Sequence, residues 1–273
     1  MATDLSFITV CKGRLQNLKQ TLPLLAAQPD TESVVVDYAC PQGTRHWIRD
    51  NFPGVKSVAV DDDSGFCVAR GRNLGAIAAT TGRLCFIDAD VRIRADFVPW
   101  VRRNWQSRHY FRAVPLDQDI WGTFVCPAED FSRIGGYDEA IRGWGGEDDD
   151  LYMRLEDVGC RPSGFPAALL DPIRHEDAER VVFYDIKDRW THHRVNQVYI
   201  AAKVDLAKIL GRPLSLAERT RLFEESRKGV AAVPVGAAGA VLEVSLPGDS
   251  RIPAHPEWTL EHKLVYRFLR RSP

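Results

Sequence analysis

Short apolar runs alternate with longer segments of helical periodicity through the first half of the chain. In the longer segments the apolar residues share one helix face, as Leu15, Leu18, Leu22 and Leu25 do. The short runs are continuous and rich in β-branched residues, which is typical of strands buried on both faces of a parallel sheet. The predicted strands cover residues 7–10, 34–36, 55–60 and 84–87, and the predicted helices cover residues 15–27, 45–51 and 68–79. The pattern indicates an α/β fold assembled from βα units.

The second half of the chain has a less regular pattern. A further strand is expected over residues 121–126, and further helices are expected over residues 147–157, 180–210 and 215–228. Ser215, followed three residues later by Glu218, predicts a capping box at the start of the last of these helices. Residues 229–248 are rich in alanine, valine and glycine, so they could pair as a hairpin.

Composition excludes some classes of protein. The 273 residues suit one large domain or one domain with an appendage, and 36 basic residues balance 37 acidic ones. This balance argues against a nucleic-acid binder that works by neutralising phosphates. The six cysteines are scattered without a C-x-x-C pair, so we expect buried free thiols and a reducing compartment. No signal peptide and no membrane-length apolar run is evident, which predicts a cytoplasmic protein.

Two acidic residues follow the fourth predicted strand. Asp88 and Asp90 are two positions apart, so in an extended chain they point to the same side. Ligands of parallel sheets gather beyond the carboxyl ends of the strands, where Asp37 also lies, at the end of the second strand. Paired carboxylates there suit a hard divalent cation that also contacts a diphosphate. A turn with two solvated aspartates is the simpler alternative for so short a motif.

The stretch Gly143-Trp144-Gly145-Gly146-Glu147-Asp148-Asp149-Asp150 is the most informative part of the sequence. Its glycines permit unusual backbone angles, and its acidic residues fall in the first turn of a predicted helix. Helix capping accounts for one or two of these acids but not for four in succession. An ionised carboxylate at this place can accept the proton of an attacking sugar hydroxyl. The indole of Trp144 offers a flat apolar face to a sugar ring.

This stretch resembles the W-G-G-E-D-D-D signature of the β-1,4-galactosyltransferases and is similar to the W-G-G-E-D/N segment of bacterial chondroitin-type polymerases. Asp88-Ala89-Asp90 matches the D-x-D motif of that family. Two other elements resemble those of family 2 glycosyltransferases: Arg72-Asn73-Leu74-Gly75 is similar to R-N-x-G, and residues 134–139 match G-G-[FY]-D-E. The four elements occur in the family's order across roughly residues 5–180.

The resemblance implies the GT-A fold, with a mostly parallel central sheet flanked by helices. It implies a catalytic domain over residues 1–210, with a donor half at about 1–95 and an acceptor half at about 96–210, and a C-terminal extension over residues 211–273. The implied activity is metal-dependent, inverting transfer of a sugar, with galactose or N-acetylgalactosamine favoured, from a UDP-sugar to a carbohydrate hydroxyl. The implied setting is bacterial polysaccharide biosynthesis.

The resemblance also implies a metal site. Asp90 would ligate the metal directly, and Asp88 would contact the ribose or support the metal. His175 stands where these families place a metal-binding histidine. Ligation by carboxylate and imidazole together favours Mn²⁺, with Mg²⁺ as the alternative. The methionine ligand of the galactosyltransferases has no match, because Met153 is expected inside a helix and in the core.

For the acceptor side, Asp148 aligns with the carboxylate proposed as the catalytic base in the family. Glu147 and Asp149 would hold acceptor hydroxyls or brace the base. Trp144 and Gly145 would contact the acceptor, which would be a glycan or a lipid-linked glycan. The pair His192-His193 could form a second acceptor wall, although a helix surface is the simpler interpretation.

For the donor side, Thr9 and Arg14 lie where the family binds uracil and ribose, and Asp37 lies where an acidic residue reads the uracil ring. Arg72 would lie near the nucleotide, with a surface salt bridge as the alternative. Phe66 would stack with the base or belong to the core. Residues 36–41 depart from the family's V-D-D-G-S sequence, which puts the details of base binding in question.

Residues 258–271 combine aromatic and aliphatic residues with four basic ones. They are interpreted as an amphipathic helix that lies on the inner face of a membrane, or that packs on the domain with a solvated basic face. Three other functions stay open: a retaining GT-A transferase, a sugar nucleotidyltransferase and a non-catalytic glycan-binding module. The nucleotidyltransferase would need a longer glycine-rich N-terminal loop than Lys12-Gly13-Arg14 supplies.

Overall fold

A computed structural model describes residues 3–174, 176–233, 239–245, 257 and 263–269 of the chain. The chain divides into two compact units. The first unit comprises Met1–Glu139 and Glu147–Tyr184, and the second comprises Ala140–Gly146 and Asp185–Pro273. This division by packing falls near residue 184, whereas the functional division expected at residue 210 stays a prediction.

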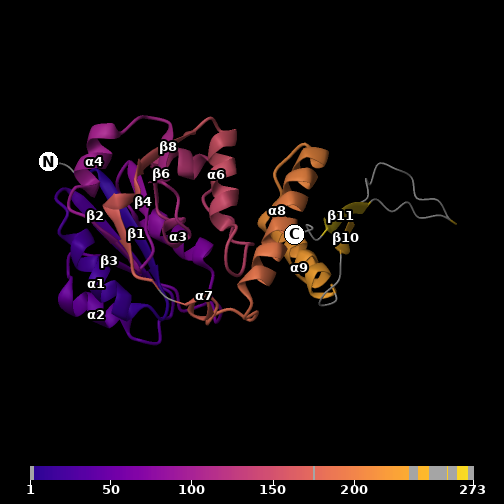
Figure 1. Cartoon of the computed structure of the whole chain (residues 1–273), viewed down its shortest axis with the longest axis horizontal. Coiled ribbons are helices and arrows are strands. Elements are labelled where there is room, and N and C mark those ends of the chain that lie inside the picture. The colour runs from indigo at the N-terminus through magenta and orange to yellow at the C-terminus, as the bar shows by residue number, and fades with distance from the viewer. Residues whose placement is uncertain (1–2, 175, 234–238, 246–256, 258–262, 270–273) are drawn as a thin grey trace. The chain divides into compact units, whose positions relative to one another are not determined.

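A seven-stranded sheet forms the centre of the first unit, in the order β3-β2-β1-β4-β7-β6-β8 (Figure 1). Neighbouring strands pair in parallel except where β7 meets β4 and β6, so β7 is the strand that runs against the rest. The strands are β1 (Leu5–Cys11), β2 (Thr31–Asp37), β3 (Lys56–Ala59), β4 (Arg83–Phe86), β6 (His109–Val114), β7 (Phe124–Pro127) and β8 (Arg161–Pro166). The predicted mostly parallel α/β sheet is confirmed.

Helices flank this sheet, which explains the continuous apolar runs of its central strands. The helices of the first unit are α1 (Leu15–Ala26), α2 (Thr44–Asn51), α3 (Val68–Ala78), α4 (Phe97–Asn104), α5 (Ala128–Arg133), α6 (Glu147–Asp157) and α7 (Asp177–Arg180). A separate antiparallel pair joins β5 (Val91–Ile93) to β9 (Leu170–Pro172). This pairing brings the chain after the D-x-D motif beside the chain that precedes position 175.

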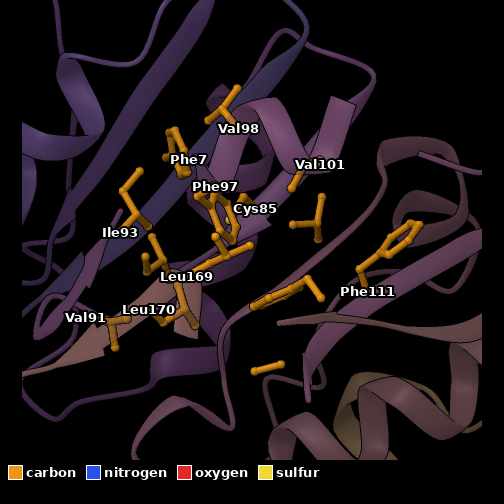
Figure 2. Packing of buried hydrophobic residues seen from close by; sticks show 14 of the residues in the cluster. Phe7, Cys85, Val91, Ile93, Phe97, Val98, Val101, Phe111, Leu169 and Leu170 are labelled. Carbon is orange, nitrogen blue, oxygen red and sulfur yellow. The ribbon is translucent and has the colours of Figure 1, made fainter. Parts of the chain in front are cut away.

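The two faces of the sheet bury separate apolar clusters, because successive residues of a strand point to opposite faces. Phe7 and Cys85 belong to the cluster that α4 covers, as Figure 2 shows with Phe97 packed nearby. Ile8 and Phe86, the next residues of the same strands, belong to the cluster on the other face. All six cysteines are free and buried, as predicted.

The second unit contains α8 (Arg189–Leu210), α9 (Leu216–Ala231), β10 (Gly239–Ser245) and β11 (Lys263–Leu269). The capping box of Ser215 and Glu218 is confirmed, with both reciprocal hydrogen bonds present. Residues 140–146 pack with these helices, since Ala140 and Ile141 share a core with Val195.

Two C-terminal expectations are wrong. The start of the expected 229–248 hairpin continues α9, and β10 pairs instead with β11. The expected amphipathic helix over 258–271 is a strand over residues 263–269, because Leu264 and Tyr266 face the core while Lys263, Val265 and Arg267 are exposed. This period of two fits a strand. Residues 258–262 and 270–271 lie outside the described residues. Within the ranges that are described, no helix has both the length and the hydrophobicity to cross a membrane.

Candidate active site

Arg72 is held in place by the close contact of α3 with the sheet. A Cβ atom on Gly75 would lie 2.4 Å from Cγ2 of Ile8, and one on Gly71 would lie 2.7 Å from Cγ1 of Val10. Glycine is therefore needed at both positions for the helix to approach β1. This contact directs the Arg72 side chain, which is 4% exposed, towards the carboxyl ends of the strands.

The Arg72 guanidinium joins the D-x-D motif to the acidic start of α6. Its Nη2 donates to Oδ1 of Asp88 at 2.8 Å, and its Nη1 donates to Oδ1 of Asp148 at 2.7 Å. Glu147 Oε1 lies 3.7 Å from the same Nη1. Three carboxylates from two distant parts of the sequence thus surround one buried cation. The alternative prediction, that Arg72 forms a salt bridge on the surface, is wrong.

Asp148 is buried and its orientation is fixed. Its Oδ1 accepts a second hydrogen bond, from the hydroxyl of Tyr137 at 2.9 Å. Asp88 is more open, with 41% of its side chain exposed. The cluster therefore contains a buried carboxylate, Asp148, that two donors orient, and a second carboxylate, Asp88, that reaches solvent.

Gly122 forms one wall of this cluster, a role that no pattern in the sequence indicated. A Cβ atom there would lie 2.5 Å from Nη2 of Arg72, 3.1 Å from Oδ2 of Asp148 and 3.3 Å from Oδ2 of Asp88. Any side chain at this position would displace the ion pairs. The predicted strand over 121–126 begins only at Phe124, because Trp121 and Gly122 form a turn that brings the backbone to the carboxylates.

Burial and crowding shift the pKa values of these acids. Burial raises the pKa of Glu147 to about 8, and the neighbouring Asp148 charge adds to the effect while Arg72 opposes it. Burial likewise raises the pKa of Asp148, against the influence of Arg72. The pKa of Arg72 lies well above its usual value although burial alone would lower it, because Asp148 and the other acids favour its charge. Burial thus favours the protonated form of Glu147, whereas Arg72 favours the ionised form of Asp148.

The chemistry of these residues fits a divalent cation. Their donors are carboxylate oxygens, the ligands that Mg²⁺ and Mn²⁺ prefer, and Oε2 of Glu147 is buried without a hydrogen-bond partner in the described chain. Asp90 is half-buried, and its backbone carbonyl accepts from the N–H of Ile173 at 2.7 Å. Across the described residues, no three His, Cys, Asp or Glu side chains already form a metal-binding group. His175 lies outside those residues.

Two of the predicted donor-side residues, Asp37 at the end of β2 and Arg14 just after β1, already have structural partners. Both carboxylate oxygens of Asp37 accept backbone N–H groups, from Cys40 at 2.7 Å and Arg45 at 2.8 Å, so Asp37 fixes the turn into α2. Arg14 pairs with Glu179 at 2.9 Å.

Phe66 packs edge-on against Tyr38, with 5.3 Å between ring centroids, and it also contacts Tyr184 at 5.6 Å. Thr9 is buried, and its hydroxyl has no hydrogen-bond partner in the described chain. Phe66 therefore belongs at least partly to the core, the second of the two roles expected for it.

Two predicted acceptor residues, Trp144 and Gly145, belong to the second unit. Asn196 Nδ2 donates to their carbonyl oxygens, at 3.3 Å for Trp144. Gly143 has φ of +115°, and a Cβ atom there would lie 2.1 Å from Nδ1 of His192. The glycine run thus makes room for α8, and His192 is buried beneath it rather than lying on a helix surface.

Asp149 is half-buried in the first turn of α6, in the first unit. The next acid, Asp150, pairs with Arg154 one turn later at 2.8 Å, so it has a structural partner within the helix. Of the four acids in this turn, Glu147 and Asp148 are the two that join the cluster around Arg72.

Comparison with known proteins relates this region to galactosyltransferases. Residues 106–177 match the family model of the N-terminal domain of galactosyltransferase. β-1,4-Galactosyltransferase 5 of Sus scrofa is 38% identical over 95 residues, which are 29% of this chain and 24% of the relative. β-1,4-Galactosyltransferase 2 of Mus musculus is 34% identical over 91 residues, with the same shares. The chain thus spans about a quarter of the length of these relatives.

Solved structures match over most of the chain at low sequence identity. S. aureus TarS 1–349 in complex with UDP-GlcNAc has a TM-score of 0.58 at 14% identity, covering 83% of this chain and 72% of that one. The mannosyltransferase PcManGT from Pyrobaculum calidifontis, in complex with GDP-Man and Mn²⁺, has a TM-score of 0.55 at 16% identity, covering 85% and 74%. The chain therefore has the GT-A fold of glycosyltransferases and is related to the β-1,4-galactosyltransferases.

Proposed function

We propose that this protein is a glycosyltransferase that moves a sugar from a UDP-sugar to a hydroxyl of a glycan or lipid-linked glycan. The observation that carries the proposal is the double ion pair of Arg72 with Asp88 and Asp148. It joins a motif suited to a nucleotide diphosphate to a buried carboxylate suited to accept a proton. A glycan-binding module would not need the buried base.

Asp148 acts as the general base in this proposal. Burial makes it a stronger base than a solvated aspartate, while Arg72 favours its ionised form. Arg72 and Tyr137 both hold Oδ1, so the carboxylate keeps one orientation when the acceptor arrives. The acceptor hydroxyl gives its proton to Asp148 as its oxygen bonds to the anomeric carbon and the bond to the diphosphate breaks. This single displacement inverts the anomeric configuration.

Asp88 and Asp90, with His175, would hold a divalent cation, Mn²⁺ in preference to Mg²⁺. Bound there, such a cation supplies neutralisation of the charge on the leaving diphosphate. Among these residues, Asp88 has 41% of its side chain exposed, so its carboxylate is accessible to such a cation. Glu147 and Asp149 would contact acceptor hydroxyls or brace the base, and Trp144 and Gly145 would contact the acceptor.

The proposed donor is a UDP-sugar of the galactose or N-acetylgalactosamine type. Support comes from the galactosyltransferase relatives and from GalNAc-T7, solved with UDP, GalNAc and Mn²⁺, whose TM-score is 0.54 at 15% identity with 82% of this chain and 54% of that one covered. Thr9, Arg14, Asp37 and Phe66 would surround the nucleotide at the ends of β1 and β2. We place the protein in the cytoplasm, since its six cysteines are free.

A screen of UDP release across UDP-sugars, with and without Mn²⁺, tests the proposal. We expect release from one donor class, dependence on Mn²⁺, and loss of release in Asp148→Asn. Absence of release from every donor, together with absence of Mn²⁺-dependent UDP binding by calorimetry, would favour the glycan-binding module. The product anomer separates the inverting mechanism from the retaining alternative, which would preserve the configuration of the donor.

A further inference from the structure

We propose that Trp121 is a stacking platform for a sugar ring of the acceptor, an inference that rests on the proposed transferase function. Trp121 is 38% exposed, although the residue after it, Gly122, is buried. Gly122 is the residue whose missing side chain lets Arg72, Asp88 and Asp148 approach the backbone. The backbone of Trp121 therefore adjoins the residue that walls the carboxylate cluster, while its indole is partly open to solvent.

A column of stacked side chains supports this indole on one face. Tyr110 and Tyr152 are buried and stack with 5.3 Å between ring centroids and 6° between ring planes. The guanidinium of Arg112 lies 4.1 Å from the centroid of the Tyr152 ring and 4.6 Å from that of Trp121. The Tyr152 hydroxyl also donates to the backbone carbonyl of Trp121 at 3.0 Å. Arg112 thus contacts one face of the Trp121 ring, and Tyr152 holds the Trp121 backbone.

Arg112 packs against the rings of Trp121 and Tyr152 and also interacts with the Tyr110 hydroxyl. Its Nε and Nη2 are buried without hydrogen-bond partners in the described chain, and no ion pair of Arg112 is found there. A buried guanidinium without a carboxylate is costly unless aromatic faces compensate for it. Trp121 and Tyr152 provide these faces, so the column holds the indole in one orientation.

Isolated exposed tryptophans occur on many proteins, so exposure alone would carry little weight. Here the ring is fixed before any ligand arrives, which reduces the entropy lost on binding. A fixed indole with an open face suits the apolar C–H face of a pyranose ring. The acceptor is the sugar that must bring a hydroxyl to Asp148, and Trp121 directly precedes Gly122, whose Cβ position lies 3.1 Å from Oδ2 of that carboxylate. The column therefore points to the acceptor ring rather than to the nucleotide, whose proposed residues lie at the ends of β1 and β2.

Three variants test this assignment with two readouts. Trp121→Ala removes the platform, Trp121→Phe keeps a smaller one, and Trp47→Ala is the control. Trp47 is a half-buried tryptophan on α2, which packs beside β3 at the other end of the strand order from β6. Methyl β-D-glucopyranoside, methyl β-D-galactopyranoside and methyl N-acetyl-β-D-glucosaminide serve as acceptors, and UDP release without acceptor reports the donor site alone.

We expect Trp121→Ala to raise the acceptor KM about tenfold, the size expected for one aromatic contact, while acceptor-free UDP release stays within about twofold of the wild type. The acceptor KM of Trp121→Phe should lie between those of the wild type and Trp121→Ala, and Trp47→Ala should match the wild type. An unchanged acceptor KM in Trp121→Ala, or an equal loss of acceptor-free release, would overturn the assignment.

If the wild type releases no UDP, the transferase proposal fails, and saturation-transfer NMR with the same glycosides still tests the platform. Transfer to the ring C–H protons in the wild type but not in Trp121→Ala supports a sugar-binding platform. Equal transfer in both, or none in either, overturns it.

Discussion

The hydroxyl of Tyr137 donates a hydrogen bond to Oδ1 of Asp148 at 2.9 Å, while Asn73 holds the Tyr137 backbone from both sides. Asn73 Oδ1 accepts from the Tyr137 N–H at 2.8 Å, and Asn73 Nδ2 donates to the Tyr137 carbonyl at 3.0 Å. Gly136, with φ of +71°, leaves room for this amide, because a Cβ atom there would lie 2.5 Å from Asn73 Oδ1. The R-N-x-G and G-G-Y-D-E elements thus act together to orient the proposed base, Asp148.

Tyr137→Phe removes one hydrogen bond from Asp148 while keeping the ring. A hydrogen bond to a charged group contributes about 1.5–3 kcal/mol, so we expect kcat to fall about 10- to 100-fold. Because the hydroxyl lowers the pKa of Asp148, its removal should move the acidic limb of the rate profile to higher pH. Steady-state kinetics across pH measure both effects. UDP affinity is the control, and an unchanged profile with unchanged kcat would show that Tyr137 only packs.

Gly122→Ala should remove transfer without unfolding the protein. The new methyl group would lie 2.5 Å from Arg72 Nη2 and must displace the double ion pair. Gly82→Ala is the matched control, since a Cβ atom there meets nothing within 4 Å. Turnover and melting temperature measure the two effects separately. Wild-type turnover in Gly122→Ala would mean that the cluster tolerates rearrangement.

Arg72→Ala should destabilise the protein strongly, because it leaves Asp148 and Glu147 buried without their cation. Removing one partner of a buried ion pair typically costs about 3–5 kcal/mol. Urea unfolding gives the change in the free energy of unfolding, with Arg70→Ala as the control. Arg70 is a neighbouring arginine that pairs with the exposed Asp62 at 2.7 Å and lies 3.9 Å from Asp63, and pairs that reach solvent contribute about 0–1 kcal/mol. Equal effects of the two substitutions would contradict the conclusion that Arg72 compensates the buried carboxylates.

The raised pKa of Glu147 predicts how stability varies with pH in the metal-free protein. Its ordinary pKa is 4.5 and its folded pKa is about 8, so between these values the folded state keeps a proton that the unfolded state releases. Stability from this group is therefore lost as pH rises through that window. Glu147→Gln removes this pH-dependent loss of stability. The difference in melting temperature between the variant and the wild type should therefore increase as pH rises between these values, and then level off. A difference that is independent of pH, or that falls, would show that Glu147 is not held protonated.

The sequence was sufficient to predict much of the donor-side architecture. The runs around Phe7, Val35 and Cys85 are buried on both faces of the sheet, which leaves few alternatives to parallel strands. The same logic placed Asp88 at a strand end. The strands β6 and β8 were not predicted, since His109–Val114 and Arg161–Pro166 interleave charged, small and proline residues with apolar ones.

Parts of the site depend on contacts that no local pattern encodes. Arg72 lies far in sequence from Asp148, so the sequence alone could not decide whether its charge was buried. Gly122 and Trp121 carry no recognisable motif, and their importance comes from a turn that brings the backbone to the carboxylates. At the C-terminus, the spacing of Leu264 and Tyr266 is compatible with either a strand or a helix face, and packing against α8 and α9 decides for the strand.

Asp148→Asn provides the most direct test of the account, because it keeps the shape of the side chain and removes its basicity. The two quantities to measure on one preparation are turnover, followed as UDP release in the presence of acceptor, and the affinity for UDP with Mn²⁺ by calorimetry. We expect turnover to fall by at least about a hundredfold, the lower range for loss of a general base, while UDP affinity is nearly unchanged. A variant that keeps most of its turnover, or that loses UDP affinity to the same extent, would contradict the assignment of Asp148 as the base.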